Sequence, residues 1–382
     1  MFKKVIHQLS LSDVGGVQIS FTQYLVYALK KSNFHHCVYS MHRLIKNFSV
    51  VQKYHIDINA SILNKIKFLY FLYSKKYIIH FYNNLGSNSV NKLLKLIPSS
   101  NIIFHERGNA WNAEDDDKIT YKNNALKANL ILANSNASKT MLIERFGIDK
   151  NKIRVIYNGF LSKEDEFVAK NDDRYSKKFS VGYIGRLDTP KGVHVLIESA
   201  KKLPEYDFFI AGVGPWENTL REMAKGNENI HFIGMVKEPL EFISKMDIII
   251  APSIREPLGN AIIEAGYCKK PVIATNIDGI AEIIENGVSG LLIDPEYELS
   301  FKIIPKGASP IPKIVINPKN QKFQKPKQID SNKLCKFIIQ LEKNPTLRKG
   351  YGEKLNQIIQ EKFSIEGYFE KLENIYQEIR KN

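Results

Sequence analysis

The sequence has few cysteines and lacks any long apolar run. Its 382 residues include three scattered cysteines, Cys37, Cys268 and Cys335, whose spacing fits neither a disulfide framework nor a metal site. So sparse and odd a set is typical of a reducing compartment. No window holds about 18 uninterrupted apolar residues, so we expect no transmembrane helix. Polar residues interrupt the opening "MFKKVIHQLSLSDVGG", so we expect no signal peptide either.

Acidic residues are too few to balance the basic ones. The chain has 55 Lys and Arg against 40 Asp and Glu, which gives a net charge of +15. Such an excess attracts phosphates, nucleic acid or anionic lipid. The lysines are spread along the chain and no recognised nucleic-acid-binding module is visible, so a basic nucleic-acid-binding protein is the weakest alternative.

Short apolar strands alternate with helical patterns through the whole chain. They include "KKVIHQLS", "KYIIHFYN" and "NIIFHERG" in the first half, and "SVGYIGRL", "YDFFIAGVG" and "MDIIIAPS" in the second. Continuous apolar strands separated by helices predict parallel sheets covered on both faces. The length favours two domains. We therefore predict an α/β protein with two doubly wound domains, 1–165 and 166–363, joined within the polar stretch 161–179.

Three segments stand apart from this alternation. Residues 364–382 predict an amphipathic helix, whose apolar stripe is Tyr368, Leu372, Ile375 and Ile379. Residues 302–327 hold seven lysines, five prolines and no acidic residue, and predict an inserted loop that is either solvated or membrane-bound. Residues 62–76, "ILNKIKFLYFLYSKK", predict a buried helix, with a helix on an anionic membrane as the alternative. The stripe of that helix is Ile62, Ile66, Leu69 and Tyr73, with lysines on either side.

Two turns that follow strands are candidates for phosphate binding, because ligands of open α/β sheets lie beyond the carboxyl ends of the strands. "IGRLDTPKG", residues 184–192, places Arg186 and Lys191 after a strand and before a helix, which suits a diphosphate. The alternative is two surface cations on a turn. "AGVGPWEN", residues 211–218, has Glu217 where the third glycine of a dinucleotide motif belongs. It predicts only a tight turn.

The stretch "REPLGNAIIEA", residues 255–265, carries two glutamates after an apolar strand. Glu256 is expected in a loop, Gly259 and Asn260 at the start of the next helix, and Glu264 deeper in that helix. Glycine lets a ligand approach the backbone closely. A separation of at most ~12 Å suits a nucleotide sugar, and carboxylates accept hydrogen bonds from sugar hydroxyls. The alternative is a chance pair on a solvated helix.

Three motifs, "GRLDTPKG", "PSIREPLGNAIIEA" and "DGIAEIIENGVSGLLIDP", carry a family resemblance. The chain resembles retaining, family 4-like glycosyltransferases of the GT-B fold, a group that contains bacterial capsule and lipopolysaccharide enzymes. The resemblance implies two Rossmann-like domains facing a central cleft, with the C-terminal helix crossing back to the first domain. It also implies transfer of a sugar from a nucleotide diphosphate to a glycan or lipid-linked acceptor, without metal or cofactor, in the cytoplasm or at the inner membrane surface.

The resemblance also implies roles for the charged residues of the second domain. Glu264 corresponds to the residue that binds the donor ribose, and Glu256 to the one beside the donor sugar. Arg186 and Lys191 correspond to the pair that holds the diphosphate. Another enzyme of the same fold, such as a sugar-nucleotide epimerase or a phosphorylase, is the alternative function.

Further donor-site residues are expected in loops and at strand ends. Gly259 and Asn260 present a helix start to the donor. Gly15 and Gly16 in "DVGGVQ" match the family's glycine-rich loop after the first strand. His105 in "FHERGNAWN" is the candidate to point at the donor sugar, with a strand-end histidine bonded to backbone as the alternative.

The sequence departs from the family pattern at two places. The family commonly has Gly-Gly where this chain has Asp278-Gly279, and the segment 302–327 lies outside the pattern. Outside "EDDD" the sequence has no Asp-x-Asp spacing of the kind found in metal-dependent transferases. "EDDD" at 114–117 is expected to be the solvated start of a helix instead.

Overall fold

The chain divides into two compact units. The structure is a computed structural model that describes residues 4–13, 15–97, 101–161, 178–301 and 304–381. Unit 1 comprises Met1–Leu161 and Phe363–Asn382, and unit 2 comprises Ser162–Lys362. The predicted boundary after residue 165, and most of the predicted junction, lie outside the described residues.

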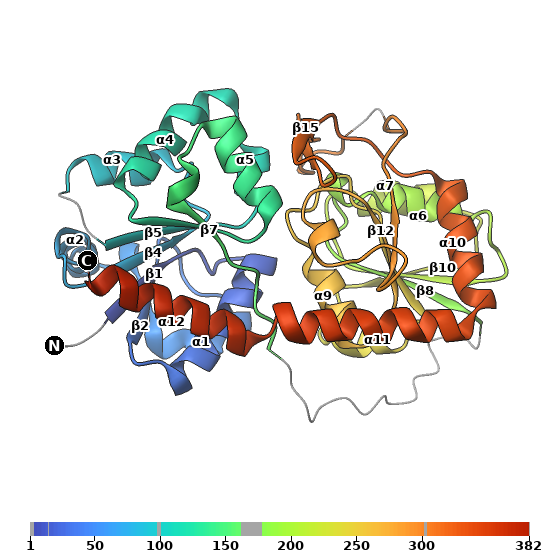
Figure 1. Ribbon diagram of the computed structural model, residues 1–382, viewed down its shortest axis with the longest axis horizontal. Helices are drawn as coiled ribbons and strands as arrows, with labels where there is room; N and C mark the ends of the chain where they lie inside the picture. Colours follow the sequence, from blue (N-terminus) through green and yellow to red (C-terminus); the bar gives the residue numbers. More distant parts are fainter. Residues whose placement is uncertain (1–3, 14, 98–100, 162–177, 302–303, 382) are drawn as a thin grey trace. The chain divides into compact units, whose positions relative to one another are not determined.

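Unit 1 is built on a parallel sheet with helices on both sides (Figure 1). Its described strands run in the order β3-β2-β1-β4-β5-β6-β7. All five residues of β4 are buried, as expected for a strand covered on both faces. The strands are β1 (Lys4–Gln8), β2 (His35–Ser40), β3 (His55–Asp57), β4 (Ile78–Tyr82), β5 (Asn101–Glu106), β6 (Leu130–Ala133) and β7 (Ile153–Val155). The helices are α1 (Gly16–Lys31), α2 (Ile62–Tyr73), α3 (Asn88–Lys95), α4 (Lys118–Lys127), α5 (Asn136–Phe146) and α12 (Ile365–Lys381).

Unit 2 repeats the same architecture. The described strands of its main sheet are parallel, in the order β10-β9-β8-β11-β12-β13, and a separate antiparallel pair joins β14 to β15. The strands are β8 (Ser180–Ile184), β9 (Asp207–Ala211), β10 (Ile230–Gly234), β11 (Ile248–Ala251), β12 (Val272–Thr275), β13 (Leu291–Ile293), β14 (Val315–Asn317) and β15 (Lys322–Gln324). The helices are α6 (Val193–Ala200), α7 (Glu217–Ala224), α8 (Pro239–Ser244), α9 (Asn260–Tyr267), α10 (Ser331–Lys343) and α11 (Pro345–Lys362).

The strand order creates a switch point in each sheet. In unit 2, β9 and β10 lie on one side of β8, whereas β11 and the later strands lie on the other. The loops that follow β8 and β11 therefore diverge from neighbouring strand ends, which is where doubly wound sheets bind ligands. Lys191 follows β8 and Glu256 follows β11. In unit 1 the corresponding point lies between β1 and β4, and Gly15 follows β1.

The C-terminal helix α12 packs in the core of unit 1, beside α1 and β4. The N–H of Phe160 donates to the carbonyl of Phe363 at 2.8 Å, and the N–H of Ile365 donates to Phe160 at 3.1 Å, so the returning chain is also tied by its backbone. The predicted stripe of Tyr368, Leu372, Ile375 and Ile379 is buried. The prediction that this helix crosses back to the first domain is confirmed.

Helix α2 buries a different face from the expected one. Ile62, Ile66, Leu69 and Tyr73, the predicted buried stripe, are between 46% and 76% exposed. Phe68, Phe71 and Leu72 are buried instead, and the first two contact the Tyr39 ring, with centroids 5.5 and 5.7 Å away. The expectation of a buried helix is wrong because α2 is apolar on two sides and only one of them packs. In the part of the chain that is described, no helix has the length and apolar character needed to span a bilayer.

The Lys/Pro-rich segment contains a β-hairpin where a loop was expected. β14 and β15 pair antiparallel, with Ile316 opposite Phe323, and both Val315 and Ile316 are fully buried. Pro318 lies in the connecting turn, where a missing N–H does not interrupt the ladder. The loop expectation is therefore wrong for residues 315–324, because a short apolar run outweighs the surrounding lysines and prolines.

We expect Leu372→Ala to lower the free energy of unfolding of unit 1 by about 2–5 kcal/mol, because truncating a fully buried leucine leaves a cavity. Lys371→Ala, at the exposed neighbouring position, is the control and should change it little. Urea denaturation followed by circular dichroism measures both variants. Equal midpoints for the two would contradict this packing of α12.

Candidate functional site

The turn after β8 lies directly against the end of β11. A short 3-10 helix, Thr189–Lys191, ends at Gly192, whose φ of 66° is in the left-handed region. A Cβ at Gly192 would lie 2.0 Å from the carbonyl oxygen of Pro252, so only glycine allows this approach. The turn that carries Lys191 is thereby held beside the loop that carries Glu256.

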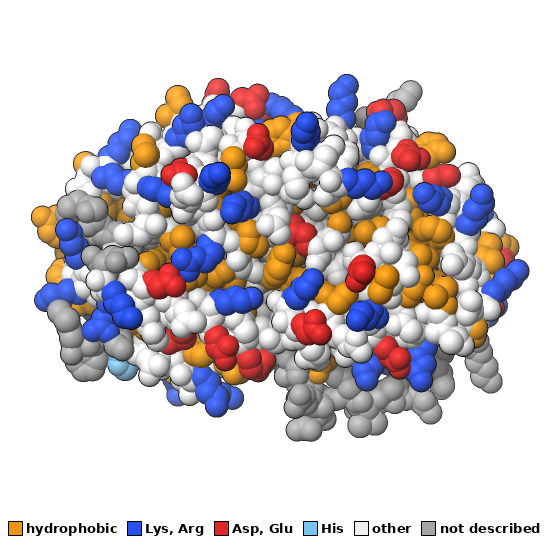
Figure 2. Space-filling view, viewed as in Figure 1, with side chains coloured by type: hydrophobic (Ala, Val, Ile, Leu, Met, Phe, Trp, Pro, Cys, Tyr) orange, Lys and Arg blue, Asp and Glu red, His pale blue; other side chains and the backbone are white. Residues whose placement is uncertain are grey.

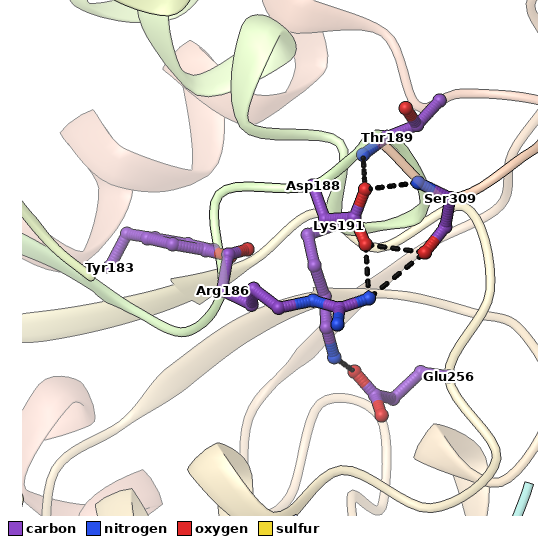
Figure 3. A network of polar contacts seen from close by, with 7 residues as sticks. All are labelled: Tyr183, Arg186, Asp188, Thr189, Lys191, Glu256 and Ser309. Atoms are coloured by element: carbon purple, nitrogen blue, oxygen red, sulfur yellow. Dashed lines mark hydrogen bonds and ion pairs between the residues drawn. The ribbon is translucent and has the colours of Figure 1, made fainter. Parts of the chain in front are cut away.

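Lys191 and Glu256 form an ion pair at this point (Figure 3). Lys191 Nζ donates to Glu256 Oε2 at 2.5 Å, and Ser253 Oγ donates to the same oxygen at 3.3 Å. The two charged side chains are 30% and 16% exposed, so solvent screens the pair less than it screens a surface pair. The structure thus brings together the cation predicted to hold a diphosphate and the carboxylate predicted beside the donor sugar.

Arg186 lies in the same turn and is oriented by Asp188 (Figure 3). Its Nη2 donates to Asp188 Oδ2 and, at 2.9 Å, to Ser309 Oγ. Burial alone would raise the pKa of Asp188, but hydrogen bonds from Ser309, the Arg186 charge and the Thr189 N–H together hold it below its usual value. Asp188 is therefore a buried, ionised carboxylate that holds an Arg186 side chain which is itself 58% exposed.

Asp278 supports the loop of Glu256 from below the surface. It is fully buried, and its φ is 45°, a left-handed value that Asp tolerates better than most residues. Its Oδ2 accepts the N–H of Glu256 at 2.9 Å, and its Oδ1 accepts the N–H of Ile316 at 2.7 Å. The neighbouring Gly279 N–H donates to the carbonyl of Glu256 at 3.1 Å. One carboxylate thus joins the site loop to the β14–β15 hairpin.

Glu264 lies in α9, which begins at Asn260 directly after Gly259. Burial raises the pKa of Glu264 to about 7, and no charge or hydrogen bond adds to that shift. Among the described residues no hydrogen bond to its carboxylate is found. Glu256 stands outside the helix, so the alternative of a solvated helical pair is wrong. Glu264 keeps some contact with solvent, and a half-buried carboxylate with a raised pKa and no partner is typical of a ligand site.

The remaining predicted residues lie in unit 1 and are described there alone. Gly15 precedes the first residue of α1, Gly16. His105 is the last residue but one of β5, with 1% of its surface exposed, and its ring stacks on those of His80 and Tyr82 at 5.4 Å. Burial lowers the pKa of His105 well below its ordinary value. Neither ring nitrogen has a hydrogen-bond partner within the described structure, so the alternative of a backbone-bonded histidine is wrong. Its role beside a donor stays a prediction.

Sequence reasoning missed two residues that hold the site together. Asp188 accepts the N–H of Thr189 and caps the short helix, and the order Asp-Thr-Pro is the pattern that could have shown it. No sequence pattern indicates Ser309, because its partner Asp188 is 121 positions away along the chain. In the described ranges no three His, Cys, Asp or Glu side chains are grouped so that they could hold a metal ion.

All of the charged residues predicted for unit 2 lie in a segment with known relatives. Residues 164–304 match the family Glycosyl transferases group 1. This group 1 segment contains Arg186, Lys191, Glu256 and Glu264. It ends inside the Lys/Pro-rich segment and before the β14–β15 hairpin.

Two curated relatives extend the group 1 match. The capsular polysaccharide biosynthesis glycosyltransferase CapM of Staphylococcus aureus is 26% identical over 267 residues, which are 68% of this chain and 58% of CapM. The lipopolysaccharide core biosynthesis glycosyltransferase LpsE of Rhizobium meliloti is 30% identical over 114 residues, which are 29% of this chain and 34% of LpsE. The chain thus spans little more than half of CapM and about a third of LpsE.

A solved structure matches nearly the whole chain. HepE of Anabaena, crystallised in complex with UDP-glucose, has a TM-score of 0.75 over 98% of this chain and 99% of its own, at 19% identity. Likeness at that identity shows the fold alone. With the two parallel sheets and the returning C-terminal helix, it confirms the predicted GT-B fold. The predicted cleft between the two domains stays a prediction.

We expect Glu264→Gln to become more stabilising as the pH rises. The folded-state pKa of about 7 lies above the ordinary 4.5, so wild type loses stability as the pH rises through this window. Glutamine loses no proton there. The difference in free energy of unfolding should grow by on the order of 2 kcal/mol between pH 5 and pH 8.

Scanning calorimetry at both pH values measures this difference, and Glu228→Gln, at an exposed position, is the control. A difference for Glu264→Gln that does not change with pH would contradict the assignment of a raised pKa.

Proposed function

We propose that the chain is a retaining glycosyltransferase that moves a sugar from a nucleotide-diphosphate donor to a glycan or lipid-linked acceptor in cell-surface polysaccharide synthesis. The observation that carries the proposal is the placement of Arg186, Lys191 and Glu256 at the switch point of unit 2, inside the group 1 segment. The names of CapM and LpsE, which refer to capsule and lipopolysaccharide, support the type of product.

In this proposal the donor diphosphate binds to Arg186 and Lys191. Lys191 then leaves Glu256 for the phosphate, and the freed Glu256 carboxylate lies beside the sugar. Both bonds are charge-assisted, and the exchange is favoured because the diphosphate carries more negative charge than the single Glu256 carboxylate. Glu264 accepts the ribose hydroxyls, and these donors favour its ionised form against the burial that raises its pKa.

The reaction step needs no group outside this set. The bond between the sugar and the diphosphate breaks, the acceptor oxygen bonds to the sugar on the same face, and the leaving phosphate takes the acceptor's proton. Arg186, Lys191 and the backbone N–H groups around Gly259 and Asn260 stabilise the charge that develops on the diphosphate. We therefore propose that neither a metal ion nor a cofactor takes part. Glu256 and His105 orient the sugar in this scheme.

Two alternative functions are kept. An epimerase or phosphorylase of the same fold would use the same donor residues, and nucleotide release that requires an acceptor distinguishes a transferase from them. Nucleic-acid binding is suggested by the net charge alone. On the face shown in Figure 2, Lys and Arg side chains are interspersed with Asp and Glu over both units. Such mixing does not favour a nucleic-acid surface on this face.

Lys191→Ala should weaken donor binding about 10- to 100-fold, because it removes a charge-assisted bond to the diphosphate. The control is Lys201→Ala, an exposed lysine just after α6. Calorimetric titration with UDP-glucose, GDP-mannose and ADP-glucose, each in excess EDTA, tests donor binding and metal independence together. Equal effects of the two variants would refute a placed diphosphate site. Binding that appears only after magnesium is added would refute metal independence.

The exposed face of α2 supports an anionic membrane as a partner. Six large apolar side chains on it are exposed, namely Ile62, Leu63, Ile66, Leu69, Tyr70 and Tyr73. At about 100° per residue they form one arc, with Lys65 and Lys67 at its two borders. Between Asp57 and Glu106 the sequence has six lysines and no acidic residue. An apolar arc bordered by lysines is the pattern of a helix that lies in a bilayer surface, so we place the enzyme at the cytoplasmic face of the membrane.

The double variant Ile66→Glu/Leu69→Glu should reduce binding to phosphatidylglycerol vesicles at least about tenfold, because two apolar contacts are replaced by repelled charges. Ile119→Glu/Leu126→Glu, which alters two exposed apolar residues of α4, is the matched control. Co-sedimentation at low salt measures binding. Equal sedimentation of the two double variants would remove α2 as the contact.

A further inference from the structure

We propose that the Lys/Pro-rich segment, described over 304–327, positions residues of the donor site and is not a membrane contact. In this proposal Ser309 is a positioning residue for Arg186, and Asp278 is one for Glu256. The inference rests on the proposed function, since it concerns the same site. It explains why the two departures from the family pattern, Asp278 in place of a glycine and the Lys/Pro-rich segment, occur in the same chain.

The first anchor is Ser309, which contacts the turn after β8 that carries Arg186 and Asp188 (Figure 3). Its N–H donates to Asp188 Oδ1 at 2.7 Å, and its hydroxyl donates to Asp188 Oδ2 at 2.5 Å. The same hydroxyl oxygen accepts from Arg186 Nη2 at 2.9 Å. The guanidinium of Arg186 is therefore held by Asp188 of its own turn and by Ser309 of the Lys/Pro-rich segment. Because a rigid guanidinium loses less entropy on binding phosphate, this contact favours diphosphate affinity.

The second anchor is Asp278, which pairs with the first strand of the hairpin. Its N–H donates to the carbonyl of Ile316 at 3.0 Å, and its carboxylate accepts the N–H of Ile316 at 2.7 Å. The other carboxylate oxygen accepts the N–H of Glu256 at 2.9 Å. A glycine would adopt the φ of 45° without strain, but it has no carboxylate to accept the N–H groups of Glu256 and Ile316. The strain of this backbone conformation at Asp278 is offset by these two bonds.

The two anchors act on different parts of the proposed donor. Ser309 acts through Asp188 and Arg186 on the diphosphate, whereas Asp278 acts through Glu256 on the sugar. A third contact of the same segment, Lys319 Nζ to Asp294 Oδ2 at 2.7 Å, touches none of these residues. Lys319 therefore provides a control within the segment itself.

The test compares a nucleoside diphosphate with its nucleotide sugar, using whichever of UDP and UDP-glucose, GDP and GDP-mannose, or ADP and ADP-glucose wild type binds best. Ser309→Ala should weaken both members of the pair about 3- to 10-fold, and Ser309→Thr, which keeps the hydroxyl, should restore affinity. Asp278→Gly should weaken the nucleotide sugar at least about tenfold and leave the diphosphate within about twofold. Lys319→Ala should change neither.

Hydrogen exchange supplies a second measurement that needs no ligand. The amides of Glu256 and Ile316 should exchange faster in Asp278→Gly than in wild type or Lys319→Ala, because their acceptor is gone. Wild-type affinities in Ser309→Ala and Asp278→Gly would overturn the inference and leave the proposed function standing. If wild type binds none of the three pairs, the proposed function fails and the donor role of the segment fails with it. Unchanged exchange would independently show that Asp278 does not hold the loop.

Discussion

The contact between Lys191 and Glu256 depends on Gly192, which has no side chain of its own to take part in binding. Gly192 brings the turn after β8 to the end of β11, where a Cβ would lie 2.0 Å from the Pro252 carbonyl oxygen. Any other residue would push the turn away, and the 2.5 Å ion pair would be lost. The parallel sheet provides neighbouring strand ends, but side-chain chemistry at those ends requires the two loops to touch. The organisation of the proposed donor site follows from that one close approach.

The carboxylates of unit 2 differ in how many hydrogen bonds they accept. This difference separates structural residues from residues proposed to bind a ligand. Asp188 and Asp278 are buried and held by donors on both carboxylate oxygens. Asp278 accepts one backbone N–H on each oxygen. Asp188 accepts two backbone N–H groups on Oδ1 and side-chain donors on Oδ2. Glu264 is half-buried and lacks such donors, and this partial burial raises its pKa to about 7. Since burying a carboxylate without donors is unfavourable, the fold tolerates a cost at Glu264 that a hydroxyl-bearing ligand would relieve.

The two sheets, the C-terminal amphipathic helix and the strand-end positions of Arg186, Lys191 and Glu256 could be predicted from the residues, because apolar patterns and strand-end motifs are local features. The return of that helix to unit 1 was expected only from the family resemblance. The buried face of α2 was not predictable, since Phe68 and Ile66 belong to two apolar faces and only packing selects one. The hairpin was hidden by composition, because seven lysines and five prolines surround the buried pair Val315 and Ile316. Ser309 was unpredictable for another reason. Its partner is distant along the chain, and nothing in a serine's local sequence indicates a remote carboxylate.

His105 belongs to a row of buried histidines in unit 1, and this setting limits what it can do. His7 and His36 are joined at 2.8 Å, His80 bonds to the Tyr376 hydroxyl at 2.8 Å, and His105 stacks on His80. Burial lowers the pKa of His7, His80 and His105 well below the ordinary value, so these rings are neutral near pH 7. A neutral imidazole can donate one hydrogen bond and accept another, but it cannot offset the charge of a diphosphate. In the proposed reaction His105 therefore orients a hydroxyl, and the cations of unit 2 carry the electrostatic stabilisation.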